Sequence, residues 1–239
     1  MRNENNLLST ITSIRLGIST KTDDSMKKTD GTVDLENIKK FLKEKKLSEQ
    51  VVCMEQVHGG KAAVVSDNKL ETVAEVDGLI TTTKGLSLAV LTADCLPLLL
   101  HDSKKGVIGA AHAGSKGLLK KIIHNTIGVF KTNFASDPQD IIVSIGPSIE
   151  KSCYEVGSEL IAQFEQEFEW FDTSYFAGSN NNRYLLDLRK IALQSLIKEG
   201  ILREHIEISS ECTKCSVDTL YSYRGGDKTG RFVSVISLE

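Results

Sequence analysis

The sequence has no long hydrophobic run and no strong excess of charge of either sign. Its 239 residues include 29 Lys and Arg against 32 Asp and Glu, which gives a formal net charge of -3. No segment approaches the roughly 18 apolar residues of a transmembrane helix, and the weakly acidic balance offers no basic surface for nucleic acid or anionic lipid. These absences argue against a helical membrane protein and against a nucleic-acid-binding or membrane-surface protein.

Cysteine is also scarce, with five residues at unlike spacings. An odd, scattered set in a chain that is neither short nor evidently secreted argues against a disulfide framework. The N-terminal segment MRNENNLLSTITSIR lacks the apolar stretch of a secretory signal. We therefore expect a cytoplasmic protein whose thiols are reduced.

Internal repeats and low-complexity tracts are absent as well. Two polar stretches, residues 20–32 and 178–183, interrupt the alternation of strand-like and helix-like segments. The pattern after each stretch is of the same kind as before it, so neither marks a domain boundary. The first is typical of a surface loop or a mobile flap. We therefore expect a single domain over residues 1–239. A chain of this length with 40% apolar residues can form a sizeable core without disulfide cross-links.

Short β-rich runs and helical periodicities alternate along the chain. The strands are expected at 51–54, 62–65, 79–82, 88–92, 96–100, 107–111, 141–145, 206–208 and 232–237. Helical spacing of apolar residues occurs at 118–134, 158–168 and 188–199. The fold class is therefore predicted to be α/β, a mixed-sheet sandwich with helices covering the sheets.

Three short segments each carry one potential metal ligand. They are QVHG with His58, TADCLP with Cys95 and AAHAG with His112. Each ligand lies near the end of a predicted strand, so the three could meet in one pocket. Zinc held by two imidazoles and one thiolate keeps a fourth position for water or substrate, which is typical of catalytic rather than structural zinc.

The spacing of these ligands leaves other interpretations open. They lack the close spacing of a zinc finger or an HExxH helix, and a single buried His or Cys is more often a packing residue. Two His and one Cys are also the equatorial ligands of blue copper, for which Met54 could be the axial ligand. A multicopper oxidase, however, needs more imidazoles than the five His present.

A family resemblance is carried by longer segments in a fixed order. They are QVHG, DGLITT, LAVLTADCLPLLL, GAAHAG, IGPSI with CYEVG, and SYRGGDKTGR. From about Val51 to the C-terminus the chain resembles the YfiH family, also called the laccase-domain or polyphenol oxidase family. A fainter likeness, TSIRLGIS, covers residues 12–19. The family shares its fold with the catalytic domain of cytotoxic necrotizing factor.

This resemblance implies a zinc site at His58, Cys95 and His112. It also implies purine nucleoside phosphorylase activity, with adenosine deaminase and methylthioadenosine phosphorylase side activities, and some members are described as peptidoglycan editing factors. Two motifs depart from the family: HAGWRG is here HAGSKG, and SYRRDG is here SYRGGD. Ser115 therefore replaces an aromatic side chain, Lys116 replaces one arginine, and Gly225 leaves a second guanidinium missing, so base preference and phosphate affinity stay open.

The two reactions would need different groups around the metal. Zinc activates water near neutral pH, as deamination of adenosine requires. A carboxylate that is not a ligand would then shuttle the proton, and Asp94, beside Cys95, is the candidate by position. The alternative for Asp94 is a turn or capping carboxylate.

Phosphorolysis needs cations for phosphate and a small-molecule pocket for the purine nucleoside. Arg15, Lys116 and Arg224 are the cations beside the motifs, and an Arg side chain can hold two phosphate oxygens at once. Gln56 and Tyr223 are candidates to orient the ribose or the base. We expect these five residues to bind substrate.

The remaining cysteines carry weaker signals. Cys212 and Cys215 form CTKC, but no second pair completes a four-thiolate site and no clear helix follows, as a thioredoxin-like motif would require. Cys53 and Cys153 lie in apolar or turn segments and are interpreted as packing residues.

Two further functional classes compete with the zinc enzyme. In a metal-free cysteine hydrolase acting on an amide such as a muropeptide, Cys95 would be the nucleophile and His112 the base. In a non-enzymatic binding module, the departures at Ser115 and Gly225 would mark lost catalysis. The sequence leaves the preferred nucleoside, the protein partners, the pathway and the oligomeric state undefined.

Overall fold

A six-stranded mixed sheet forms one half of the molecule. The computed structural model describes residues 7–66, 71–171 and 174–239. The strand order is β13-β9-β7-β8-β5-β3, in which β9, β7, β8 and β5 are antiparallel neighbours while β13 and β3 pair in parallel at the edges. The strands are β3 (Ala62–Val64), β5 (Gly78–Thr81), β7 (Leu96–Asp102), β8 (Val107–Ala113), β9 (Ile141–Ile145) and β13 (Ile206–Ile208).

A five-stranded sheet lies against it. The order is β1-β14-β6-β2-β4, with the first three strands antiparallel and the last two joined in parallel. The strands are β1 (Ile14–Ile18), β2 (Val51–Met54), β4 (Thr72–Val73), β6 (Ser87–Thr92) and β14 (Phe232–Leu238).

The two sheets share an apolar core. Leu88, Val90 and Ile236 from the five-stranded sheet pack with Leu99 and Ile108 from the six-stranded sheet. The central strands β6, β7, β8 and β14 are buried on both faces. Their sequences are therefore mostly apolar throughout and do not alternate between apolar and polar residues.

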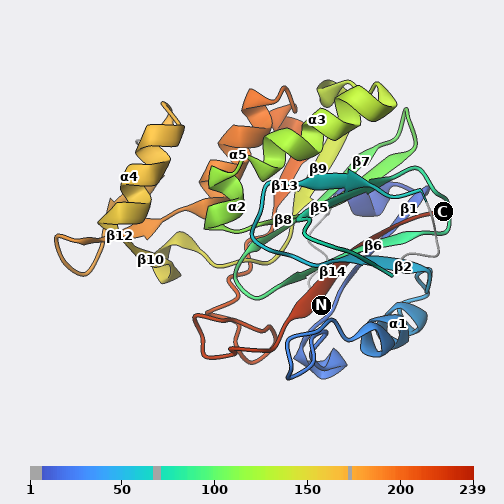
Figure 1. Cartoon of the computed structure of the whole chain (residues 1–239), viewed down its shortest axis with the longest axis horizontal. Coiled ribbons are helices and arrows are strands. Elements are labelled where there is room, and N and C mark those ends of the chain that lie inside the picture. Colours follow the sequence, from blue (N-terminus) through green and yellow to red (C-terminus); the bar gives the residue numbers. More distant parts are fainter. Residues whose placement is uncertain (1–6, 67–70, 172–173) are drawn as a thin grey trace.

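Helices cover the outer faces of both sheets (Figure 1). The helices α2 (Ser115–Leu119), α3 (Ile122–Phe134) and α5 (Leu188–Lys198) contribute to one apolar cluster with the six-stranded sheet. On the other side, α1 (Leu35–Glu44) packs its buried residues against the five-stranded sheet. This order of helices, sheet, sheet and helix confirms the predicted α/β mixed-sheet sandwich.

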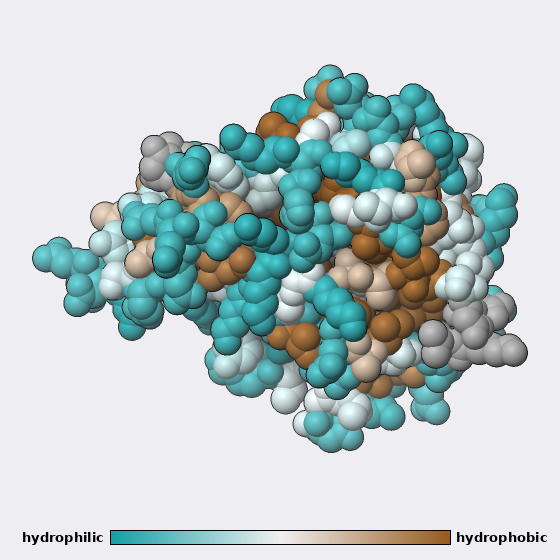
Figure 2. Space-filling view, turned by 45° about the horizontal axis from the view of Figure 1, so that its top comes forward, coloured by the Kyte–Doolittle hydropathy of each residue, from teal (hydrophilic) through white to brown (hydrophobic). Residues whose placement is uncertain are grey.

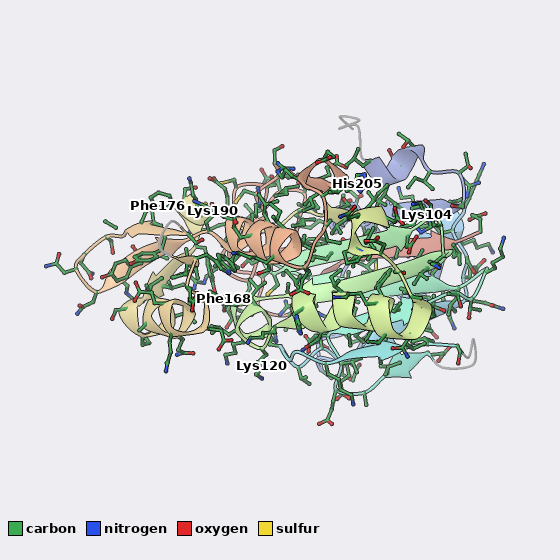
Figure 3. All side chains as sticks on the ribbon, turned by 90° about the horizontal axis from the view of Figure 1, so that it is seen from above. Lys104, Lys120, Phe168, Phe176, Lys190 and His205 are labelled. Atoms are coloured by element: carbon green, nitrogen blue, oxygen red, sulfur yellow. The ribbon has the colours of Figure 1, made fainter. Side chains whose placement is uncertain are left out.

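A small three-stranded sheet extends from one end of the sandwich (Figure 1). It consists of β10 (Glu155–Gly157), β12 (Arg183–Leu186) and β11 (Tyr175–Ala177), with α4 (Ser158–Glu167) beside it. Seen from above, Phe168 and Phe176 lie in this part, whereas Lys104 lies at the opposite end of the molecule (Figure 3). The helical spacing at 158–168 predicts α4, but no pattern in the sequence predicts these three strands.

The predicted helix over 118–134 is in fact two helices with a break between them. Lys121 has a φ of 60°, in the left-handed region that ends α2 and starts α3 in a new direction. The loop before β3 fills the break, because Asn125 Nδ2 donates to the Gly60 carbonyl at 2.6 Å. A Cβ on Gly60 would lie 2.0 Å from the Lys120 carbonyl oxygen, so only glycine fits there.

Two strands near the predicted ligands are longer than expected. β8 runs to Ala113, so His112 lies inside the strand rather than after it, paired with Pro97 of β7. Pro97 lies inside β7, as the strand expected over 96–100 implies. A proline is accommodated at this second position of β7, where the Pro97 carbonyl still accepts the Gly146 N–H at 2.9 Å.

The polar stretch over residues 20–32 is anchored rather than a free flap. The Met26 N–H donates to the Arg231 carbonyl at 2.9 Å, and the Met26 side chain is fully buried. Asn37 Nδ2 of α1 donates to the Asp23 and Ser25 carbonyls. The backbone of this segment is thus bound by β14 and by a polar side chain of α1, which hydrophobic periodicity does not reveal.

Hydrophilic residues cover most of the face in Figure 2, and hydrophobic residues form interrupted patches on it. Within the described ranges, no helix combines the length and the apolar composition that crossing a membrane requires.

Candidate active site

A pocket of about 870 Å³ opens where strands of both sheets end. Its lining includes Met54 at the end of β2, Thr92 at the end of β6, and His112 near the end of β8. Its volume is within the range of pockets that bind small molecules and cofactors. His58 and Cys95 line the same pocket, so the structure brings the three predicted ligands together.

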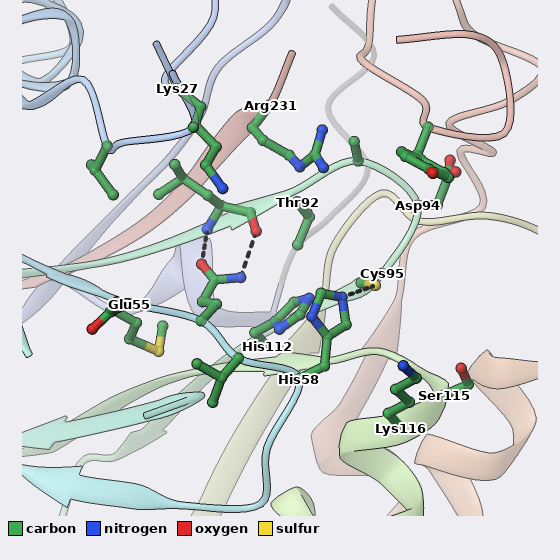
Figure 4. A pocket seen from close by; sticks show the side chains of 18 of the residues that line it. Lys27, Glu55, His58, Thr92, Asp94, Cys95, His112, Ser115, Lys116 and Arg231 are labelled. Carbon is green, nitrogen blue, oxygen red and sulfur yellow. Dashed lines mark hydrogen bonds between the residues drawn. The ribbon is translucent and has the colours of Figure 1, made fainter. Parts of the chain in front are cut away.

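The three ligand side chains converge in this pocket (Figure 4). One ligand atom from each of His58, Cys95 and His112 lies within 4.8 Å of the other two. His58 Nε2 is 3.9 Å from Cys95 Sγ, and the two imidazole rings meet edge to face with centroids 4.7 Å apart.

Asp77 is buried beside these ligands and fixes two of them. Its carboxylate accepts the His112 Nδ1 hydrogen at 2.7 Å and the backbone N–H groups of Val57, His58 and Gly59 at 3.2, 3.1 and 2.6 Å. Burial raises the pKa of Asp77, but these hydrogen bonds outweigh it and hold the pKa below its usual value. Because Nδ1 is occupied, Nε2 is the His112 atom left for a metal or a proton.

The backbone around the ligands is unusually constrained. A Cβ on Gly114 would lie 2.8 Å from Cys95 Sγ and 3.2 Å from a carbon of the His58 ring, so this position requires glycine. His58 and Asp94 are non-glycine residues with positive φ, at 54° and 99°. Strain of this kind persists only where the surroundings enforce it, and functional sites concentrate it.

The ligands also form a charged pair. Burial would raise the pKa of the Cys95 thiol, but the charge and hydrogen bonding of His112, with a further contribution from His58, lower it to about 6. Burial lowers the pKa of His112, but the Cys95 thiolate and the Asp77 carboxylate raise it to about 9. Near pH 7 the metal-free site therefore favours a thiolate beside an imidazolium.

Asp94 lines the pocket, but hydrogen bonds occupy its carboxylate. Oδ1 accepts the hydroxyls of Thr213 and Ser222 at 2.7 and 2.6 Å, and Oδ2 accepts the Arg224 N–H at 2.7 Å. This geometry favours the anchoring alternative over the proton shuttle. Asp94 attaches the segment that carries Tyr223 and Arg224 to the strand ends.

Gln56 and Tyr223, which were predicted to orient the ribose or the base, differ in how tightly their side chains are held. The Gln56 side-chain amide pairs with the backbone of Leu91, donating to its carbonyl at 2.8 Å and accepting its N–H at 2.9 Å. Gln56 thus extends the link between β2 and β6 while lining the pocket. Tyr223 also lines it and is 47% exposed, with the Lys228 ammonium 4.1 Å from its ring centroid.

Four cationic side chains line the pocket in the described part of the chain. Two of them, Lys116 and Arg224, were predicted. The other two, Lys27 and Arg231, were missed, and in Figure 4 they enter from the side opposite to Lys116. Burial, together with the nearby Arg231 charge, lowers the pKa of Lys27.

Arg15, which was expected to bind phosphate, is not among the residues that line this pocket. It pairs with Ser237 in the sheet register and forms an ion pair with Glu239 at 3.2 Å. The pocket lies at the other end of β14, next to Arg231.

Motif context could have pointed to some of the missed residues. Asp77 stands in DGLITT and Arg231 in SYRGGDKTGR, both segments that carry the resemblance. Lys27 lies in the polar stretch that was interpreted as a loop, so no local signal marked it.

The donor set fits a zinc ion. Two imidazoles and one thiolate are common zinc ligands, and three protein ligands leave a position for another group. The Asp77 contact to His112 Nδ1 is the carboxylate-histidine arrangement that orients a metal-ligating imidazole.

Comparisons with known proteins agree with this architecture. A family model described as multi-copper polyphenol oxidoreductase laccase matches residues 12–239. Relatives include purine nucleoside phosphorylase YfiH of Escherichia coli, 32% identical over 85% of this chain and 80% of its own length. Purine nucleoside phosphorylase Rv2149c of Mycobacterium tuberculosis is 32% identical over 80% of this chain and 73% of its own length.

Two crystal structures have the same fold. Hypothetical protein YfiH of Bacillus licheniformis has a TM-score of 0.86 and 27% identity, covering 95% of this chain and 93% of that chain. YlmD of Geobacillus stearothermophilus has a TM-score of 0.85 and 26% identity over the same shares.

Proposed function

Because the chain belongs to the laccase-domain, or YfiH, family, we propose that it is a zinc-dependent purine nucleoside phosphorylase. The observation that carries this proposal is the convergence of His58, Cys95 and His112 in a pocket lined by four cations. Such a pocket offers a ligand set for one metal ion next to positive charge for one phosphate. The substrates are then a purine nucleoside and inorganic phosphate.

Zinc would be held by His58, Cys95 and His112, and when bound it supplies a Lewis acid. The chain's own residues prepare that ligand set. Asp77 keeps the His112 tautomer with its hydrogen on Nδ1, and the positive φ of His58 turns its imidazole toward Cys95. The low pKa of Cys95 keeps sulfur in the thiolate form that binds metal.

We assign phosphate binding to the cations that line the pocket. Lys27, Lys116, Arg224 and Arg231 can surround a dianion, and they replace the two-arginine motif from which this chain departs at Gly225. Phosphorolysis then joins a phosphate oxygen to C1′ of the ribose while the C1′ to N9 bond breaks and its electron pair leaves with the purine. Holding the anion against the sugar is the main task of these side chains.

The base and ribose would lie between Gln56 and Tyr223. Since the Gln56 amide is already paired with Leu91, it contributes a fixed wall, whereas the half-exposed Tyr223 ring is available for stacking. Deamination of adenosine and phosphorolysis of methylthioadenosine are proposed as side activities of the same pocket. The three hydrogen bonds at Asp94 argue against it as the proton shuttle for deamination.

The first experiment is incubation of the zinc-loaded protein with inosine or adenosine, with and without phosphate. Free base that forms only with phosphate supports phosphorolysis, and inosine formed from adenosine supports deamination. Elemental analysis and the visible spectrum distinguish zinc from a copper-thiolate site. Absence of both products at high enzyme concentration contradicts the proposal.

The phosphate site is tested by Lys27→Ala and Arg231→Ala. Loss of one charged hydrogen bond costs about 1.5–3 kcal/mol, so the KM for phosphate should rise roughly 10–100-fold in each variant. The matched control is Lys28→Ala, because Lys28 is exposed on the same segment and is absent from the pocket lining. An equal effect of all three substitutions would point to net charge rather than to a phosphate site.

A metal-free cysteine hydrolase is the second candidate, because Asp77, His112 and Cys95 also form a carboxylate-imidazole-thiolate series. His112 Nδ1 is 2.7 Å from Asp77, and the His112 charge lowers the pKa of Cys95 to about 6. Such a pair is sufficient for nucleophilic attack on an amide. Activity on an amide that survives chelators but is abolished by iodoacetamide would select this candidate, and the reverse pattern would select zinc.

A further inference from the structure

Three other cysteines meet at a second place in the fold. Cys153 ends the 3-10 helix Lys151–Cys153, and Cys212 and Cys215 lie in the loop after β13. The Cys153 and Cys215 sulfurs are 3.4 Å apart, and the three sulfurs lie within 4.8 Å of one another. We call these three residues the cysteine cluster, and it contains no ligand of the pocket described above.

We propose that the cysteine cluster is a second metal site, which binds a thiophilic d10 cation, Zn²⁺ or Cu⁺, through three thiolates. Zinc-sulfur bonds of about 2.3 Å in a tetrahedral site place the sulfurs roughly 3.8 Å from one another. The spacing in the cluster brackets this value, so small side-chain rotations complete the site. On binding, each thiol loses its proton to the buffer as a metal-sulfur bond forms, and no oxidation state changes.

The choice of metal follows from the ligand type. Thiolates are soft ligands that select zinc and monovalent copper, whereas Mg²⁺, Ca²⁺ and Mn²⁺ prefer oxygen ligands. All five cysteines lie in the described residues and none forms a disulfide, so the three thiols are available. Their burial decreases from Cys212 through Cys153 to Cys215, which is exposed. A cation can therefore reach the cluster directly from solvent.

The backbone around the cluster is already held in place. The Cys212 Sγ accepts the Glu150 N–H at 3.3 Å, which links the loop to the 3-10 helix. The Thr213 N–H donates to the Ser148 carbonyl at 3.1 Å, and Arg189 Nη2 donates to the carbonyls of Ser148 and Glu211 at 2.7 and 2.6 Å. Because both segments are already ordered, little further conformational entropy is lost when a cation brings the three sulfurs together.

A metal here would join two segments that form one wall of the pocket. Tyr154 follows Cys153 directly, and Arg224 follows the loop that contains Cys212 and Cys215. The Arg224 guanidinium lies 4.6 Å from the centroid of the Tyr154 ring, and its Nη1 donates to the Glu155 carbonyl at 2.8 Å. The inferred role is therefore structural: the cation stabilises the contact between these two segments.

The primary test is metal stoichiometry of the full-length, reduced protein after dialysis against Zn²⁺. The expected content is two equivalents for the unmodified protein and one for the double variant Cys153→Ser, Cys215→Ser, whose substituted residues are only partly buried. His58→Ala with His112→Ala should also retain one equivalent. Cys53→Ala is the matched control and should retain two, because Cys53 is buried in β2 among apolar residues.

Cobalt substitution identifies the ligands independently of activity. Sulfur-to-cobalt charge-transfer absorption grows with the number of Co²⁺-thiolate bonds. A three-thiolate site should therefore absorb more strongly than the pocket site, which has one thiolate. The double variant should lose most of this absorption. Hydrogen exchange in residues 150–156 and 211–224 should slow when the second equivalent binds, and should not slow in the double variant.

Three results would overturn the proposal. The first is a single equivalent in the unmodified protein, and the second is two equivalents that remain in the Cys153, Cys215 double variant. The third is a reduced protein that takes up neither Zn²⁺ nor anaerobically supplied Cu⁺ at the cluster, yet loses two thiols on air oxidation unless Cys153 is substituted. That last pattern would identify a redox pair instead. Competition between Zn²⁺ and Cu⁺ decides which cation the cluster prefers.

Discussion

The two ligand clusters of this molecule are built in opposite ways. His58, Cys95 and His112 stand at or next to the ends of buried strands, and a fully buried carboxylate orients one of the imidazoles. The cysteine cluster stands on a 3-10 helix and a loop, and backbone N–H groups, among them that of Glu150, contact Cys212 there. The first cluster mixes nitrogen and sulfur, while the second holds sulfur alone.

The difference indicates what each cluster can do. Strand ends fixed by Asp77 hold the ligands in one geometry and leave a position facing a large pocket, as catalysis requires. The cysteine cluster faces solvent through Cys215, and Tyr154 and Arg224 lie between its segments and the pocket, as suits a cation that stabilises structure. Four predictions test this contrast.

The largest effect is expected from Gly114→Ala. The new methyl group would lie 2.8 Å from Cys95 Sγ and would push it away from the histidines. A displacement near 1 Å can cost about 100-fold in rate, so phosphorolysis should fall by about that factor. The control is Gly128→Ala in α3, where the added carbon meets nothing within 4 Å and activity should be unchanged. Full activity of Gly114→Ala would show that the first cluster is not tightly constrained.

Asp77→Asn is expected to weaken metal binding at the first cluster by about 10–100-fold, which is the usual cost of losing an orienting carboxylate. The amide can no longer accept every N–H that now meets the carboxylate. Affinity is measured by chelator competition, and metal content at the cysteine cluster serves as an internal reference. Asp137→Asn, at an exposed turn, is the control. Equal losses of metal affinity at both clusters would show that Asp77 does not act specifically on the first cluster.

Thiol reactivity should separate the clusters in metal-free protein. The His112 charge lowers the pKa of Cys95 to about 6, whereas hydrogen bonds with Cys153 and Cys212 raise the pKa of Cys215. At pH 7 iodoacetamide should therefore modify Cys95 roughly tenfold faster than Cys215, although Cys215 is more exposed. Because a thiolate is lost as pH falls through its pKa, the Cys95 rate should drop near pH 6. Peptide mapping measures both rates, and faster labelling of Cys215 would refute the assignment.

The smallest effect is expected for Cys153→Ser without metal. This side chain is only partly buried at the edge of the apolar core, and serine has nearly the same size, so the free energy of unfolding should change by less than about 1 kcal/mol. With Zn²⁺ present, the unmodified protein should become more stable than the variant, because a ligand that binds only the folded state stabilises it. Urea unfolding with and without Zn²⁺ measures both differences.

The sequence predicted the first cluster because each ligand lies in a recognisable segment near a strand end. It could not predict that Asp77 contacts His112, 35 positions away, or that Cys153 meets Cys215, 62 positions away. Those contacts depend on strand order and loop paths, which periodicity does not encode. The interpretation of Cys153 as a packing residue is confirmed by its contact with the apolar core, but its proximity to Cys215 could not be predicted.

The position of Arg15 outside the pocket has a similar cause. Nothing in the local sequence specified that β1 pairs with β14 in a register that places Arg15 opposite Ser237, away from the pocket. The missing prediction of α1 and of the small three-stranded sheet reflects short or polar segments whose structure depends on tertiary contacts. A single domain over residues 1–239 and a cytoplasmic location stay predictions.

The pairing of β1 with β14 has a consequence for biosynthesis. Val233 donates its N–H to the Ser19 hydroxyl across 214 positions of sequence, and the Met26 N–H donates to the Arg231 carbonyl. During translation the early segment must therefore wait until residues 231–238 have left the ribosome before its partner exists. Contacts between such remote stretches form slowly. The side of the pocket that carries Lys27 and Arg231 is thus expected to mature last, after the segments with His58, Cys95 and His112 have been synthesised.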